Sequence, residues 1–164
     1  MIRDATGDAD VAVVRRLFEA YAASLDVDLC FQNFTQELAD LPGDYAPPGG
    51  CLLLAEANGY AQGCVALRPL AAADATAAGI GEVKRLYVEP RARGAGVGRV
   101  LMHALLDRAR RAGYRELKLD TLATMATARM LYASLGFREC AAYYRNPLPG
   151  TLYMALRLDR APSG

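Results

Sequence analysis

The sequence predicts one α/β (α+β) domain over residues 1–164, in which helices flank a mixed, mostly antiparallel sheet. Helical and strand-like patterns intermix along the whole chain instead of separating into halves, which favours this class. Asn58-Gly59, between two apolar runs, is the strongest short signal of a β-hairpin. Farther along, a strand runs directly into a glycine-rich turn and a helix. The length is that of one ordinary domain.

Two amphipathic helices are expected near the start of the chain, after a short strand at Ile2-Arg3. Apolar residues at intervals of three and four place the beginning of the first helix near residues 6–8. The same spacing predicts a second helix over 31–41, which Pro42-Gly43 ends. The prolines and glycines of 44–50 indicate a loop.

The hairpin comes next, with apolar strands over 51–57 and 60–70 on either side of its turn. An alanine-rich link over 71–79 then leads to a third strand, 82–88. This strand stops at a turn that contains three glycines, so the next element begins without a long connection.

Helices and strands alternate through the second half of the chain. A helix over 97–112 is closed by Gly113 as its C-cap. Its predicted buried face consists of Val97, Val100, Leu101, Ala104, Leu105, Ala109 and Ala112. Alternating apolar and polar residues predict a half-buried strand over 117–121. The remaining elements are a helix over 124–135 and strands over 137–139 and 151–158.

The composition excludes several classes of function. A net charge of +1 gives no general attraction to nucleic acid or to an acidic membrane. Four cysteines without close spacing and a single histidine make a metal site unexpected, and the thiols are expected to be reduced. The start of the chain is too polar for a signal peptide, and no run of eighteen apolar residues occurs. We therefore expect a cytoplasmic protein.

The glycine-rich turn is the most informative stretch. Glycines occupy positions 94, 96 and 98 between the end of a strand and the start of a helix. Glycine lets the backbone approach a ligand, and the free amides of a helix N-terminus favour an anion. From Glu82 to Arg99 there are five basic and two acidic residues, a local charge of +3. These features together suit a pyrophosphate.

Two nucleotide-binding patterns fit this turn poorly. The P-loop pattern needs Lys-Ser or Lys-Thr after its last glycine, but Arg99-Val100 stands there. Arg99 also replaces the last glycine of the dinucleotide fingerprint. About 65 residues follow the turn, too few for a doubly wound domain.

The chain resembles the GNAT superfamily of acetyl-CoA-dependent N-acyltransferases over 82–137. Arg93-Gly-Ala-Gly96-Val-Gly98 fits the superfamily's R/Q-x-x-G-x-G/A loop, and 128–137 fits its A-x-x-L-Y-x-x-x-G-F segment. The resemblance implies a sheet of six or seven strands with about four helices. It further implies that 81–139 form the acetyl-CoA-binding core and that 1–80 form the acceptor side.

The resemblance implies these cofactor contacts. Main-chain atoms of Leu86, Tyr87 and Val88 would meet pantetheine, and the turn would hold the phosphates. The residues of the turn are Arg93, Gly94, Ala95, Gly96, Val97, Gly98 and Arg99. Met125 stands where relatives often carry an asparagine, so that cofactor hydrogen bond would be either missing or supplied by Thr124 or Thr127. Arg129 would either approach the adenosine phosphate or lie in solvent.

Aminolysis of a thioester needs an acid for the thiolate and a base for the amine. Ala128, Leu131 and Leu135 form the predicted core stripe of their helix, and Tyr132 lies at its flank, where it would protonate the departing thiolate or else pack its ring in the core. Glu82 stands where members of the family often place a base, so the resemblance implies that it serves the amine, or else it is a surface glutamate. Asp120 is a weaker candidate for the base.

The expected acceptor is a small-molecule or peptide amine. Tyr143, Tyr144 and Arg145, in an aromatic and proline-bearing connection, would help to line its site or would serve packing. We expect a monomer or homodimer without metal, nucleic acid or membrane. The alternative function is a non-catalytic acyl-CoA-binding or regulatory module.

Overall fold

The computed structural model describes residues 1–25, 28–29, 33–70 and 78–159. Its strands are β1 (Ile2–Asp4), β2 (Cys51–Ala57), β3 (Tyr60–Pro69), β4 (Ile80–Val88), β5 (Glu116–Leu122), β6 (Arg138–Cys140) and β7 (Thr151–Arg157). Its helices are α1 (Gly7–Ser24), α2 (Phe34–Asp40), α3 (Val97–Arg111) and α4 (Ala126–Ser134), with short 3₁₀ turns η2 (Gly43–Tyr45) and η4 (Pro90–Ala92).

The seven strands form one mixed sheet in the order β1-β2-β3-β4-β5-β7-β6. Only β4 and β5 pair in parallel, and every other neighbouring pair is antiparallel. Four α-helices accompany this sheet within the described ranges. The predicted class, a mostly antiparallel sheet of six or seven strands with about four helices, is confirmed.

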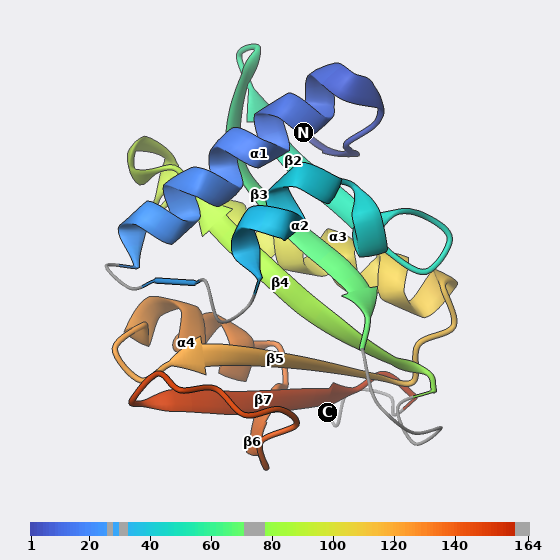
Figure 1. The fold of residues 1–164 in the computed structure, drawn as a ribbon, viewed down its shortest axis with the longest axis vertical. Coiled ribbons are helices and arrows are strands. Elements are labelled where there is room, and N and C mark those ends of the chain that lie inside the picture. Colours follow the sequence, from blue (N-terminus) through green and yellow to red (C-terminus); the bar gives the residue numbers. More distant parts are fainter. Residues whose placement is uncertain (26–27, 30–32, 71–77, 160–164) are drawn as a thin grey trace.

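Helices cover both faces of the sheet, which explains why β2 is apolar at every one of its first five positions. Leu52 and Leu54 pack with α1 on one face. Leu53 and Ala55 pack with α3 on the other, since successive strand side chains point in opposite directions. Figure 1 shows α1 and α2 in front of the sheet and α3 behind it.

The sheet splits between β4 and β5. These strands pair only through residues 80–82 and 116–118, and beyond those residues no ladder joins them. In Figure 1 the two ribbons diverge from this short contact. A register shift between β3 and β4 lies opposite Arg85, whose φ of 58° is unusual for a residue with a side chain. The bulge and the split leave one edge of β4 open.

The structure corrects some predicted details. Val100 is 52% exposed and Ala112 is exposed, so neither belongs to the buried face of α3. Met102 and Leu106 are buried instead. Apolar residues on this helix could form either of two adjacent stripes, and contact with β2 and β3 selects one of them.

The segment predicted as a loop over 44–50 is not wholly irregular, because it begins within η2, where Tyr45 is buried. The second helix begins at Phe34; its predicted residues 31–32 lie outside the described residues, as do 71–77 of the alanine-rich link.

Candidate active site

A narrow slot lies where β4 and β5 separate. Its free space is about 30 Å³, close to the share of one water molecule in the liquid. The described residues that line it are 83–86, 119–122, Tyr21, Leu25, Leu29, Met125, Tyr132, Asn146 and Leu148. Tyr21 comes from α1 on one face of the sheet and Tyr132 from α4 on the other, so the slot passes through the split sheet.

The glycine-rich turn joins β4 to α3 beside this slot. Gly94 and Gly96 have φ of 80° and 79°, a conformation that side chains disfavour. No described residue accepts a hydrogen bond from the backbone amides of 94–99; the first helical bond runs from the Val100 amide to the Gly96 carbonyl. A Cβ on Gly94 or Gly96 would meet nothing within 4 Å. The turn therefore offers unpaired amides and open space to an anion.

Arg93 and Arg99 belong to the turn and Arg129 lies on α4, and each side chain donates a hydrogen bond to a neighbouring group. Arg93 donates from Nε to the Val88 carbonyl at 2.9 Å. Arg99 donates to the Ser134 hydroxyl of α4 at 3.0 Å. Arg129 donates to the Ala123 carbonyl at 2.9 Å. Each guanidinium keeps further N–H groups for an anion. Thr124 is exposed just before α4.

The side chains at the end of β4 point alternately to the two faces of the sheet. Leu86 lines the slot and Val88 packs on the α3 side. Tyr87 turns to the α1 side, where its ring meets Tyr21 at 6.4 Å. Since β5 does not pair with this part of β4, main-chain groups on that edge can bond an extended ligand.

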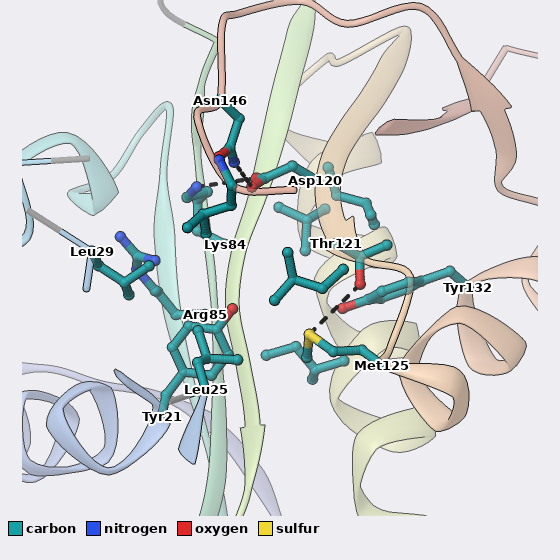
Figure 2. Close-up of a pocket in the computed structure, with 15 residues that line it drawn as sticks. Tyr21, Leu25, Leu29, Lys84, Arg85, Asp120, Thr121, Met125, Tyr132 and Asn146 are labelled. Carbon is teal, nitrogen blue, oxygen red and sulfur yellow. Dashed lines mark hydrogen bonds and ion pairs between the residues drawn. The ribbon is translucent and has the colours of Figure 1, made fainter. Parts of the chain in front are cut away.

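Tyr132 is the most buried residue of α4, at 7% exposure. Its ring packs on Phe137 with centroids 5.9 Å apart, while Figure 2 shows its hydroxyl in the slot. The predicted core stripe of Ala128, Leu131 and Leu135 is only half-buried, so Tyr132 does not lie at a flank. Within the described part of the chain, the hydroxyl has no hydrogen-bond partner. Burial raises the pKa of Tyr132, so the phenol stays protonated at neutral pH.

The two candidate bases lie in different surroundings. Glu82 is 3% exposed, pairs with Arg68 at 2.8 Å, and accepts the Tyr143 hydroxyl at 2.7 Å. It is thus not a surface residue, and it is not among the described residues that line the slot. Asp120 does line the slot.

Asp120 carries its charge inside the slot. Its carboxylate accepts from Lys84 Nζ at 3.2 Å and from the Tyr144 hydroxyl at 2.8 Å. Burial raises the pKa of Asp120, but the Lys84 ammonium and the Tyr144 hydroxyl together outweigh it and lower that pKa. Figure 2 shows Asp120 facing Lys84, with Asn146 beside them.

The connection between β6 and β7 reaches across the split. Tyr143 bonds Glu82 of β4 and Tyr144 bonds Asp120 of β5. The two rings pack 5.3 Å apart, which braces the connection. Arg145 is exposed, so the structure brings two of the three predicted acceptor residues toward the slot.

The sequence reading missed several polar residues near the slot. Lys84 and Arg85 line it, and Arg85 pairs with Glu37 of α2 at 2.9 Å. Tyr21 was visible only as one apolar position of an amphipathic helix. No local pattern distinguishes a tyrosine that faces a slot from one that faces the core.

Among the described residues, no group of three or more histidine, cysteine, aspartate or glutamate side chains could hold a metal ion. No described helix is long and apolar enough to cross a bilayer. Cys51, Cys64 and Cys140 are free thiols.

Known proteins are similar to this chain in sequence and in fold. Residues 14–137 match the model of the acetyltransferase (GNAT) family. An uncharacterised N-acetyltransferase of Schizosaccharomyces pombe is 38% identical over 152 residues, covering 92% of this chain and 90% of that protein. The N-acetylaspartate synthetase of Rattus norvegicus is 37% identical over 124 residues, covering 74% of this chain and 40% of that protein.

A GNAT-family acetyltransferase from Staphylococcus aureus Mu50 has the same fold, with a TM-score of 0.76. The match covers 96% of this chain and 98% of that chain at 18% identity. Together, the family match over most of the chain and the close relative in fission yeast confirm the resemblance seen in the sequence. The chain belongs to the GNAT family of acetyl-CoA-dependent N-acetyltransferases.

Proposed function

We propose that the protein moves the acetyl group of acetyl-CoA directly to a primary amine, within a ternary complex and without a covalent enzyme intermediate. One observation carries this proposal: the unpaired amides of 94–99 lie at the end of β4, the same strand that walls a slot holding a phenol and a carboxylate. An anion site next to such a slot fits a donor with a diphosphate at one end and a thioester at the other.

The donor would lie along the open edge of β4. The amides of 94–99 would bind the diphosphate, with Arg93 and Arg99 adding charge-assisted bonds. Main-chain groups of 86–88 would pair with pantetheine, which would bring the thioester to Tyr132. Thr124 and Arg129 would contact the cofactor at the β5–α4 connection. Residues 81–139 would thus form the donor core.

Tyr132 would serve the leaving group. When the amine adds to the thioester carbonyl and the C–S bond breaks, negative charge develops on sulfur. The Tyr132 phenol is protonated and has no protein partner in the described structure, so it can donate a hydrogen bond and then its proton to that sulfur. The nitrogen loses two protons on its way from ammonium to amide: one is released to water and the other restores the phenol of Tyr132, so the products are an amide, the CoA thiol and one free proton.

Asp120 would hold the amine. Its ionised carboxylate lines the slot and can attract an ammonium. Because the pKa of Asp120 is lowered, this carboxylate is a weak base, and the ammonium proton would leave to water. Glu82 is held by Arg68 and Tyr143, and it would act as a base only through water.

The acceptor side would comprise residues 1–80 together with Tyr143, Tyr144 and Arg145. The N-acetylaspartate synthetase relative is a reason to include amino acids among the amines tested. A cytoplasmic location and a monomeric or homodimeric state remain predictions.

A two-stage experiment tests the proposal. CoA and acetyl-CoA should raise the melting temperature, whereas NAD and ATP should not. Thiol release from acetyl-CoA should then depend on an amine, with N-acetylated product found by mass spectrometry. Stabilisation by acetyl-CoA without release for any amino acid, polyamine or peptide would instead favour the non-catalytic binding module.

A further inference from the structure

Tyr21 places a second phenol at the slot, opposite Tyr132. It lies on α1, and both tyrosines line the slot. In Figure 2 the hydroxyl groups of Tyr21 and Tyr132 point into the space between them from opposite sides. Since α1 and α4 cover opposite faces of the sheet, the two phenols approach any bound thioester from two directions.

Neighbouring groups hold the Tyr21 ring in place. It packs edge-on against Tyr87 with centroids 6.4 Å apart. The guanidinium of Arg85 lies 5.8 Å from its centroid, and the ion pair with Glu37 fixes that guanidinium. Contacts of this kind fix an aromatic ring without using its hydroxyl. A phenylalanine could make the same ring contacts.

The Tyr21 hydroxyl lies close enough to the Arg85 guanidinium to interact with it, and a hydroxyl oxygen has two lone pairs, so it can still accept a further hydrogen bond. Burial raises the pKa of Tyr21, with Asp120 adding to that rise and Arg85 opposing it, so the phenol is neutral. A charge on Tyr21 would in turn raise the pKa of Tyr132, so the two phenols are near enough to interact electrostatically. The ring contacts with Tyr87 and Arg85 leave the Tyr21 hydroxyl at the slot.

We infer that Tyr21 is a second catalytic residue, whose hydroxyl accepts a hydrogen bond from the N–H of the attacking amine and directs the nitrogen lone pair at the thioester carbon. The inference rests on the proposed function. Tyr132 faces the donor side and serves sulfur, while Tyr21 lies on the acceptor side and serves nitrogen. Tyr21 gains and loses no proton, so the balance of the reaction is unchanged.

The substitution Tyr21→Phe tests this role, because it keeps the ring contacts and removes only the hydroxyl. We expect kcat/KM for the amine to fall by about 10- to 100-fold, the usual range for one lost transition-state hydrogen bond. The Kd for acetyl-CoA, measured by calorimetry, should stay within about twofold of the wild type. Tyr60→Phe is the matched control, since Tyr60 is 65% exposed, does not line the slot and should retain full activity.

Two results would overturn the inference. One is full kcat/KM for the amine in Tyr21→Phe, with loss of activity only in Tyr21→Leu, which would show that the ring and not the hydroxyl matters. The other is a weakened Kd for acetyl-CoA that accounts for the whole loss. In both cases the proposed function would stand. A wild-type protein that binds acetyl-CoA but acetylates no amine would overturn the proposed function and this inference together.

Discussion

Replacing Tyr132 with phenylalanine should separate activity from stability. The ring belongs to the core beside Phe137, and phenylalanine keeps that packing. The lost hydroxyl faces the slot and has no partner in the described chain, so its removal breaks no internal hydrogen bond. We expect the free energy of unfolding to change by less than about 1 kcal/mol, since no hydrogen bond to another described residue is lost.

The same substitution should lower kcat by about 10²- to 10⁴-fold, the usual contribution of a positioned acid. Tyr132→Ala offers a contrast, because it also empties the core and should cost about 3–5 kcal/mol. Each kcal/mol corresponds to roughly 2–4 °C in melting temperature for a chain of this size. Calorimetric melting and amine-dependent thiol release measure the two effects on the same samples.

The result for Tyr132→Phe that would refute this reasoning is a large fall in melting temperature, which would mean that the hydroxyl has a structural partner. Unchanged kcat in a stable variant would equally remove Tyr132 from the reaction.

Three further substitutions and one control probe the glycine-rich turn, the expected cofactor edge and the pH dependence. Gly96→Ala and its control Gly59→Ala both put a side chain at positive φ in open space, and each should cost about 1 kcal/mol of unfolding free energy. Calorimetry should find weaker CoA binding only for Gly96→Ala. Equal affinities of the two variants would argue against the turn as the diphosphate site. Met125→Asn should lower the KM for acetyl-CoA by about 3- to 10-fold if an amide there bonds pantetheine, and an unchanged KM would show that it does not. Arg3 lowers the pKa of Asp10 to about 2, below the value of about 3.9 for an unfolded chain. The ion pair therefore stabilises the fold fully above about pH 3.9, and this stabilisation is lost as the pH falls toward 2. Arg3→Ala should therefore flatten the fall in urea midpoint between about pH 5 and pH 3, and a slope as steep as the wild type's would exclude this pair.

Elements with a strong local signal could be predicted closely. The hairpin turn at Asn58-Gly59 forms because both residues adopt positive φ, which this dipeptide tolerates. The glycine-rich turn likewise follows from its own residues, since glycine permits the backbone that exposes the amides. Helix ends were less certain: α4 begins at Ala126 and not at Thr124, because no capping side chain marks its start.

The surroundings of the two carboxylates could not be predicted from the local sequence. Glu82 and Asp120 are both acidic residues on predicted strands, and nothing in the sequence separates their surroundings. The fold pairs Glu82 with Arg68 and places Asp120 in the slot, because distant strands and the β6–β7 connection meet there. Their partners are 14 to 61 residues away along the chain.

By itself, then, the sequence determined the class of the fold, the glycine-rich turn and the family, because each depends on residues that are neighbours in the chain. Tertiary structure alone decided that β4 and β5 part after residues 82 and 118, which opens a slot through the sheet. It also decided that Tyr21 and Tyr132 face that slot from opposite sides. The physical reason is that strand pairing and the choice of buried stripe depend on contacts between segments far apart in sequence, which no local pattern encodes.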